Sequence, residues 1–444
     1  MNRMITFKPT KVFARNGRKF LYSVEDSALY EIDDNLEYAM TLGGNTINDI
    51  LLNLVNKKNM SVEDATEMIQ MIAEAGLIVD PDEDGNKKKH LDMNLSALTL
   101  MVCQECNMKC AYCYGEGGEY KNKGRMSKKT AFRAVDYLIE NTKDDELGIA
   151  FLGGEPLMNF ELIKEVVGYC SKKSNETGKK FKFTITTNGT LLTPEKEKFL
   201  IDNHIMTQIS IDGTKEDHDS MRFFECKKPS YDVVVEKTKS MRDKGLVTSR
   251  ATLSSKNVDY IKTFEHLEKL GFAGIPIEPA KNLLSEMDKE KEYEEFVKYA
   301  EYYKKQIEKK KFDRANKMTN FSKAMERVDY SGERQYGCGA FHTMYAVDID
   351  GRLYPCHRFV GHHRFVVGSI FDDNKNSIEE WKNLNERARC SKCWMKNLCS
   401  GGCAYENFMG TGSINVSLPD FCKRMDTLYK TVIDVYIDNK YINS

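Results

Sequence analysis

The sequence lacks any apolar run close to the ~18 residues that a membrane-spanning helix needs. Its first residues, MNRMITFKPT, lack the apolar core of a secretory signal. It also lacks an excess of either charge, since 66 basic residues stand against 67 acidic ones. No overall field therefore points to nucleic acid or an anionic membrane. We expect a cytoplasmic protein that binds neither nucleic acid nor membrane.

Cysteine, by contrast, is abundant, with 13 residues in 444. Thiols stay reduced in the cytoplasm, which favours metal or redox chemistry over a disulfide framework. Four cysteines lie within 103–113 and seven within 338–422. The remaining two, Cys170 and Cys226, are interpreted as small buried side chains. The chain thus carries two separate concentrations of thiols.

The first concentration is the stretch ECNMKCAYCYGEGGEY, residues 105–120, which places thiols at Cys106, Cys110 and Cys113. Three neighbouring thiols cannot all form disulfides. Zinc prefers a closed set of four ligands. Three thiolates would instead hold three irons of a [4Fe–4S] cluster and leave the fourth iron open for chemistry.

Residues 1–80 form a unit of their own. The segment KVFARNGRKFLYS predicts a hairpin that turns at Asn16-Gly17, and ALYEID predicts a third short strand. Two amphipathic helices follow, each opened by a capping box. The capping residues are Thr46 with Asp49 and Ser61 with Asp64. This order predicts a winged helix-turn-helix module.

Three roles stay open for this module. It could be a small packing domain, or it could bind DNA, although no basic recognition face stands out. A peptide could instead add itself as a strand to the exposed edge of the hairpin. Residues 81–94 are charged and rich in turn formers, which predicts a linker.

Residues 95–290 alternate between strand and helix patterns. Six β/α units predict an α/β fold in which a parallel sheet curls into a partial (β/α)6 TIM-like barrel, with the site at the carboxyl ends of the strands. The expected strands are LSALTLMV, IAFLGGEP, FKFTITTNG, TQISIDG, SRATLS and AGIPIEP. Residues 291–336 predict a charged helical connector, and residues 337–444 a loop-rich, cysteine-rich domain.

The motifs lie at the carboxyl ends of the expected strands, where barrels of this type carry their active sites. The three-cysteine loop follows the first strand, and Gly153-Gly154-Glu155-Pro156 follows the second. Asn188 follows the third strand, while Ser210 and Asp212 belong to the fourth. Capping of the strand end is the alternative role for Ser210 and Asp212.

At this point the sequence resembles a known family. The C-x3-C-x2-C loop, GGEP, SIDG and HDSMR resemble radical S-adenosylmethionine (SAM) enzymes, and the spacing of the seven C-terminal cysteines resembles their SPASM extension. The N-terminal module resembles the precursor-recognition domain of peptide maturases. YPCHRFVG and CYGEGGEY resemble sactipeptide and ranthipeptide maturases, which form thioether bridges in ribosomal peptides.

The resemblance implies SAM and three [4Fe–4S] clusters as cofactors. Cys106, Cys110 and Cys113 would hold the radical SAM cluster. Two auxiliary clusters would be held by Cys390, Cys393, Cys399 and Cys422, and by Cys338, Cys356 and Cys403. Many relatives supply a fourth cysteine shortly before the position of Cys338, but DYSGERQYG contains none, so an open iron is expected there. Cys103 matches no motif position and is interpreted as packing.

The resemblance also implies a set of SAM contacts. Tyr112 would approach the adenine, and Gly153, Gly154 and Glu155 would meet the methionine amine. Asn188 is a further contact, and Ser210 and Asp212 would lie near the ribose or carboxylate. Arg222 is a candidate carboxylate partner, with a surface ion pair as its alternative role.

The function implied is hydrogen abstraction from a precursor peptide followed by formation of a cysteine thioether, with electrons from a donor such as flavodoxin or ferredoxin. Maturation of a sulfatase cysteine or serine to formylglycine is the alternative within the enzyme class. A non-catalytic zinc protein that binds nucleic acid is the alternative outside it.

Overall fold

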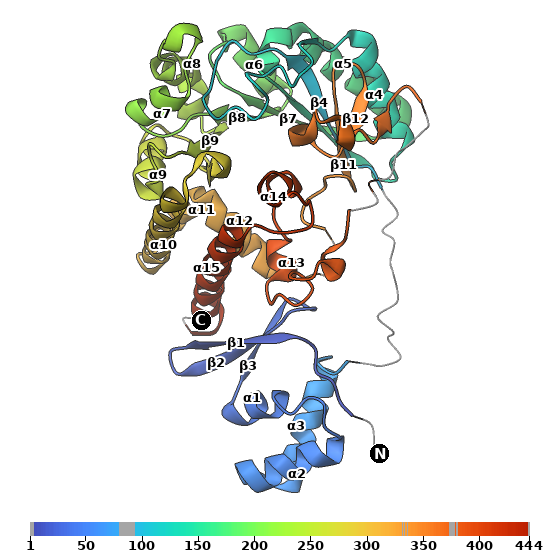
Figure 1. Cartoon of the computed structure of the whole chain (residues 1–444), viewed down its shortest axis with the longest axis vertical. Coiled ribbons are helices and arrows are strands. Elements are labelled where there is room, and N and C mark those ends of the chain that lie inside the picture. Colours follow the sequence, from blue (N-terminus) through green and yellow to red (C-terminus); the bar gives the residue numbers. More distant parts are fainter. Residues whose placement is uncertain are drawn as a thin grey trace.

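The computed structural model describes residues 4–79, 94–330, 332, 334, 336–372, 378 and 381–442. Figure 1 shows an elongated molecule, with the N-terminal module at one end and a helix-covered sheet at the other. The cysteine-rich C-terminal region lies between them. Most of the expected linker, residues 81–94, lies outside the described residues.

The N-terminal module contains an antiparallel sheet in the order β1 (Thr10–Arg15), β2 (Arg18–Ser23) and β3 (Ala28–Ile32). Asn16 and Gly17 turn the hairpin as predicted, with φ values of 49° and 75°. Both lie in the left-handed region that a type I′ turn requires.

Three helices complete the module: α1 (Asp34–Met40), α2 (Ile47–Lys58) and α3 (Val62–Glu74). The capping box of Thr46 and Asp49 is present in both directions. At α3 the Ser61 side chain accepts from the backbone of Asp64, 3.0 Å away, but Asp64 does not accept the reciprocal bond from the Ser61 backbone, so the capping box is incomplete.

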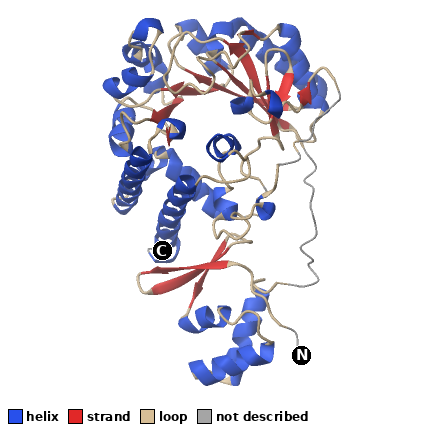
Figure 2. Cartoon of the chain, in the orientation of Figure 1, coloured by secondary structure: helices blue, strands red, loops and turns tan. Residues whose placement is uncertain are grey.

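The barrel sheet contains six parallel strands in their order along the chain, as predicted. They are β4 (Ala97–Gln104), β6 (Glu146–Gly153), β7 (Lys180–Thr187), β8 (Met206–Ser210), β9 (Val247–Leu253) and β10 (Ile277–Pro279). The intervening helices are α4 (Lys128–Glu140), α5 (Phe160–Thr177), α6 (Pro194–Asp202), α7 (Lys215–Met221), α8 (Tyr231–Asp243) and α9 (Tyr260–Lys269). Figure 2 shows these helices over the outer face of the sheet.

Strand β9 illustrates how the sequence sets the two faces of the barrel. Val247, Ala251 and Leu253 are buried in the core under the helices. Successive side chains of a strand point to opposite faces. The alternate residues, Arg250 and Thr252 among them, therefore face the inside of the barrel. Polar side chains on that face are available for a site.

The C-terminal region continues the barrel sheet, a pairing that the sequence pattern does not predict. Strand β11 (Met344–Val347) pairs in parallel with β4, and β12 (Arg352–Tyr354) and β13 (Gly368–Ser369) extend the sheet antiparallel. The short β5 (Gly124–Arg125) pairs with the end of β4. This pairing fixes the cysteine-rich region beside the strand that carries the first thiol loop.

Helices complete the C-terminal half. The expected connector contains α11 (Phe312–Lys317), α12 (Thr319–Asp329) and most of α10 (Glu286–Glu308), which begins before it. The cysteine-rich region adds α13 (Lys396–Cys399), α14 (Ala404–Thr411) and α15 (Pro419–Ile437). Helix α15 packs on α10 and α12 and contacts β1 (Figure 1). No helix in the described part of the chain combines the length and apolar character needed to cross a bilayer.

The N-terminal sheet packs directly on the cysteine-rich region. The rings of Phe13 and Trp394 meet edge to face with centroids 5.5 Å apart. Asn397 donates to the carbonyl of Val24 at 2.7 Å, and Arg15 pairs with Asp438 at the end of α15. The module is therefore not an independent appendage.

Candidate functional site

The first thiol loop connects β4 to β5 and brings three half-buried thiols together. The pKa of Cys106 is raised to about 12, chiefly by burial, with Glu155, Cys110 and Cys113 contributing to the same shift. A thiol in this environment keeps its proton unless a metal takes the proton's place. The loop therefore has the donors for a metal cluster.

Close backbone packing holds this loop against the carboxyl ends of the strands. A Cβ on Gly154 would lie 2.3 Å from the carbonyl oxygen of Glu105 and 2.8 Å from that of Gly118. Gly118 has φ of +90°, and its Cβ would lie 2.7 Å from Cβ of Cys106. Only glycine fits either position, so the GGEP turn and the thiol loop form one unit.

Glu155 is fully buried, and the protein itself supplies donors to both of its oxygens. The carboxylate accepts from the backbone of Leu157 at 3.0 Å, the hydroxyl of Thr187 at 2.7 Å and the backbone of Asn188 at 2.8 Å. Burial raises its pKa, and these donors oppose that shift. Glu155 thus ties β6 to β7, and its contact with a methionine amine stays a prediction.

Asn188 joins the loop after β7 to the thiol loop. Its Nδ2 donates to Oδ1 of Asn107 at 3.0 Å and lies 3.9 Å from Sγ of Cys106. Its Oδ1 accepts from Thr190. The predicted residue therefore lies at the thiol site.

Asp212 connects two other predicted residues. One carboxylate oxygen accepts from the hydroxyl of Tyr112 and from Nε of Arg222, the latter at 2.9 Å. The other accepts from the backbone of Thr252 at 2.9 Å. The guanidinium of Arg222 also lies over the Tyr112 ring. The alternative of a surface ion pair for Arg222 is wrong, because the pair is buried.

His218, in the HDSMR motif, was given no role from the sequence. Its Nδ1 accepts from the backbone of Asp212 at 3.4 Å, and its Nε2 lies 2.9 Å from the Ser230 hydroxyl. That hydroxyl donates to the carbonyl of Arg222 at 2.8 Å, so it accepts from a neutral Nε2–H. Burial lowers the pKa of His218 to about 4. His218 therefore positions both members of the ion pair.

Arg250 was also missed. It lies opposite Ser210 in the register of β8 and β9 and faces the inside of the barrel. Among the described residues its guanidinium makes no hydrogen bond or ion pair, whereas Arg222 is held by Asp212. The signal in the sequence was a single charged residue within the strand VTSRATL.

The C-terminal thiols gather in two sets. Burial raises the pKa of Cys356 to about 12, and Cys403 and Cys338 contribute to the shift. Burial raises the pKa of Cys399 to about 12 in the same way. Its thiol neighbours are Cys422, Cys393 and Cys390. Within the described part of the chain no three Cys, His, Asp or Glu side chains are placed to hold a single metal ion.

Nearby cations fit anionic clusters at these thiols. Arg387 is 5% exposed, and its side chain donates to the carbonyl of Lys382. Arg327 donates to the carbonyl of Leu398 and the hydroxyl of Tyr429. Neither has a carboxylate partner among the described residues, and both influence the Cys338 thiol. Thiolate-bound iron–sulfur clusters would supply the missing negative charge.

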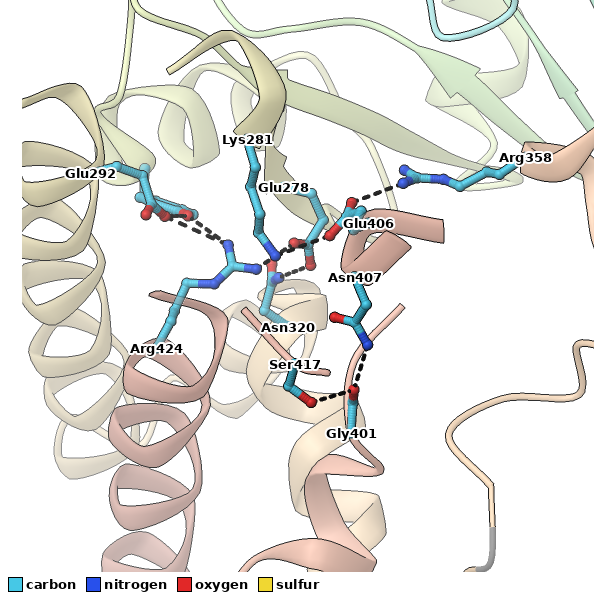
Figure 3. A network of polar contacts seen from close by, with 11 residues as sticks. Glu278, Lys281, Glu292, Asn320, Arg358, Gly401, Glu406, Asn407, Ser417 and Arg424 are labelled. Carbon is cyan, nitrogen blue, oxygen red and sulfur yellow. Dashed lines mark hydrogen bonds and ion pairs between the residues drawn. The ribbon is translucent and has the colours of Figure 1, made fainter. Parts of the chain in front are cut away.

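A polar network joins the barrel end to the cysteine-rich region (Figure 3). Glu406 accepts from Arg358 at 2.8 Å and from Lys281 at 3.0 Å. Burial alone would raise the pKa of Glu406, but the two cations lower it to about 2. Arg424, buried on α15, pairs with Glu278 of β10 at 2.8 Å. These contacts hold the cysteine-rich region against the carboxyl end of β10.

Tyr114 lies where the first thiol loop meets the Cys356 region. Its ring contacts His357 and Tyr405, with centroids 6.1 and 6.3 Å away, and Arg358 lies over it at 5.4 Å. The two thiol regions therefore share one aromatic wall.

The cysteines outside the proposed sets behave in two ways. Cys170 is buried as predicted, and Cys103 is buried with its thiol directed to the carbonyl of Glu105. Cys226 is exposed, so its interpretation as a buried side chain is wrong. It lies in a short loop with φ of 56° rather than under a helix.

Comparison with known proteins agrees with this arrangement. Residues 100–267 match the model of the radical SAM superfamily. The chain is 25% identical over 338 residues to a cysteine-type anaerobic sulfatase-maturating enzyme of Clostridium novyi, a match that covers 70% of this chain and 88% of that protein. It is 25% identical over 321 residues to the subtilosin biosynthesis protein AlbA of Bacillus subtilis, covering 69% and 66%.

Two solved structures share the fold. The structure of anSMEcpe with bound AdoMet and a Cp18Cys peptide has a TM-score of 0.65 at 21% identity and covers 78% of this chain and 99% of that one. Streptococcus suis SuiB bound to precursor peptide SuiA has a TM-score of 0.52 at 14% identity and covers 94% and 100%.

The fold and the matched domain define a radical SAM enzyme. Among such enzymes, this chain is related to anaerobic sulfatase-maturating enzymes and to the peptide maturases of the SPASM group. The predicted class of enzyme is confirmed, while the reaction itself is the subject of a proposal.

Proposed function

We propose that this protein is a cytoplasmic radical SAM maturase that forms thioether cross-links in a ribosomally made precursor peptide. The observation that carries the proposal is that a region with two sets of neighbouring thiols is fixed, through β11, beside the strand β4 that carries the first three thiols. The relatedness to AlbA supports it, since that protein acts in subtilosin biosynthesis.

Three ligand sets follow from the proposal. Cys106, Cys110 and Cys113 hold the cluster that binds SAM, and the two C-terminal sets hold auxiliary clusters. When bound, the reduced cluster and SAM together supply the hydrogen-abstracting chemistry of the superfamily. The Cys338, Cys356 and Cys403 set leaves one iron without a cysteine, and that iron would take the thiolate of the substrate.

For SAM, the proposal assigns different roles to the two arginines. Arg222 is held by Asp212 and stacks on Tyr112, so it fixes the wall of the site. Arg250 faces the barrel interior opposite Ser210 and has a free guanidinium among the described residues. Arg250 is therefore the cation proposed to receive the SAM carboxylate, with Ser210 beside it.

The N-terminal module, residues 1–80 with the linker at 81–94, is proposed to capture the leader of the precursor. A peptide strand added to an edge of its three-stranded sheet would gain main-chain hydrogen bonds. The similarity to SuiB, which was crystallised with its precursor peptide, covers 94% of this chain, against 78% for anSMEcpe. Electrons would come from a donor such as flavodoxin or ferredoxin.

The second candidate is formylglycine formation in a sulfatase, favoured by the similarity to the Clostridium novyi enzyme. One experiment separates the two. Purified anaerobic protein is incubated with SAM, a reductant and a cysteine-containing peptide encoded next to this chain. Thioether formation lowers the mass of the peptide by two hydrogen atoms and makes its cysteine resistant to alkylation. A peptide aldehyde at the cysteine would support the second candidate and refute the first.

A further inference from the structure

Arg387 lies next to both C-terminal thiol sets. It follows the short 3₁₀ turn Leu384–Glu386 and precedes Cys390 of one set by three residues. Its side chain is directed inward, since the residue is only 5% exposed. Nε donates to the carbonyl oxygen of Lys382 at 3.1 Å, which fixes the guanidinium on this loop.

No carboxylate neutralises this guanidinium in the part of the chain that the structure describes. The adjacent Glu386 is exposed, and its carboxylate accepts from the backbone of Asn383 at 3.1 Å, which caps its own turn. Burial lowers the pKa of Arg387, and the ionisable groups that oppose this shift are the thiols of Cys390 and Cys338, followed by Tyr336. These two cysteines belong to different sets. Gly337, which precedes Cys338, packs against the carbonyl oxygens of Ser400 and Gly402, on either side of Gly401.

The packing around Gly401 confirms how close one of these thiols lies. A Cβ on Gly401 would be 3.0 Å from Nη1 of Arg387 and 3.5 Å from Sγ of Cys390. The guanidinium and the thiol therefore flank the same glycine. Any side chain at this position would push them apart.

Burying a cation without a partner is costly, so such a group normally faces a compensating anion. Protonated thiols supply no such charge. Iron–sulfur clusters held by thiolates do, and their reduction potentials depend on the charges around them. The burial of Arg387 without a carboxylate partner is explained if both thiol sets hold iron–sulfur clusters.

We infer that Arg387 is a shared counter-ion for the two auxiliary clusters and raises the reduction potential of both. The inference rests on the cluster ligation in the proposed function. Reduction adds a negative charge to a cluster, and a nearby buried cation stabilises that charge. Arg387 acts through the clusters and touches no substrate, so it is a positioning residue.

The test is a potentiometric titration with dithionite, followed by electron paramagnetic resonance. The full-length protein carries Cys106, Cys110 and Cys113 replaced by alanine, so that only auxiliary clusters contribute. We expect Arg387→Gln to lower the midpoint potentials of both auxiliary clusters. Arg387→Lys keeps the charge and should shift them less.

Arg389→Gln is the matched control, because it removes the same charge from an exposed position on the same loop. Solvent screens that charge, so the shift should be small. Unchanged potentials in Arg387→Gln, or an equal shift in Arg389→Gln, would overturn the inference. Loss of auxiliary iron from Arg387→Gln but not from Arg387→Lys would support it, and loss from both would overturn it.

The titration needs no precursor peptide, so its result is independent of the cross-linking reaction. A peptide that stays unmodified would refute the thioether proposal and leave these potentials as they are. If the triple alanine protein binds no iron after anaerobic reconstitution, the auxiliary ligation fails and the inference fails with it.

Discussion

The ring of Phe13, on the first strand of the N-terminal sheet, packs edge to face on Trp394, whose neighbour is Cys393. Tyr22 meets the same indole from the next strand, at 6.1 Å between centroids. The indole nitrogen in turn donates to Asp426 of α15 at 3.0 Å. A module that the sequence separates from the cysteines by a linker is thus seated on a cysteine loop.

Phe13→Ala should destabilise the whole chain as well as the module. Deleting a buried phenylalanine costs about 3–5 kcal/mol, and here the cavity opens against Trp394. We expect a lower unfolding midpoint in urea and faster release of iron from the Cys390 set under a chelator. Lys11→Ala on the same strand is the control. If Phe13→Ala unfolds like the control, the interface does not stabilise the protein.

Stability should fall with acid through His218. Its pKa in the folded state is lowered to about 4 by burial, and in the unfolded chain it is about 6.5. The unfolded state therefore binds more protons between these values, so the stabilisation present above pH ~6.5 is lost as the pH falls toward ~4.

The measurement is the free energy of unfolding at pH 7 and pH 5. His218→Gln should reduce the difference between the two, at the cost of lower stability at pH 7. His204→Gln, at an exposed position, should leave the difference unchanged. Equal pH dependence in His218→Gln and the wild-type chain would contradict this role.

Arg250→Gln should weaken SAM binding with little effect on folding. A charge-assisted hydrogen bond contributes about 1.5–3 kcal/mol, which corresponds to a rise in Kd of about 10- to 150-fold. Arg222→Gln should instead lower the unfolding midpoint, because it leaves the Asp212 carboxylate buried without its partner. Calorimetric titration measures the affinity for SAM, and thermal unfolding measures stability, so the two methods together separate the roles of Arg250 and Arg222. Unchanged SAM affinity in Arg250→Gln would refute the assignment.

Replacing Cys106, Cys110 and Cys113 together by alanine should abolish SAM cleavage and leave the auxiliary clusters in place. Iron should fall from about twelve to about eight per chain, since each cluster holds four. Iron analysis and chromatography of 5′-deoxyadenosine measure both effects. Continued formation of 5′-deoxyadenosine by this variant would show that the ligands lie elsewhere.

The barrel was predictable because its signals are local. Alternating apolar patterns and Gly-rich turns identify each strand and its carboxyl end, and the parallel order follows from the β/α alternation. The hairpin at Asn16-Gly17 was predictable for the same reason. Cys226 was misjudged because nothing in its local pattern distinguishes a loop cysteine from a buried one.

Long-range contacts were not predictable from the same patterns. No local pattern pairs β11 with β4, and none seats Phe13 on Trp394. The motif pointed to Arg222 as the carboxylate partner, and only the fold shows that Asp212 already holds Arg222. The predicted cysteines do lie near one another in three groups. The hydrogen bonds that Glu155 accepts were not predictable, because their donors meet only when the ends of β6 and β7 come together in the fold.

The proposed function requires this enzyme to remove a hydrogen atom from a peptide. The direct measurement uses a precursor peptide deuterated on carbon at the residue to be bridged, with mass analysis of the 5′-deoxyadenosine formed. Deuterium should appear in 5′-deoxyadenosine, and the same peptide should lose its alkylatable cysteine. Unlabelled 5′-deoxyadenosine with a peptide deuterated at every carbon position would contradict the proposed function.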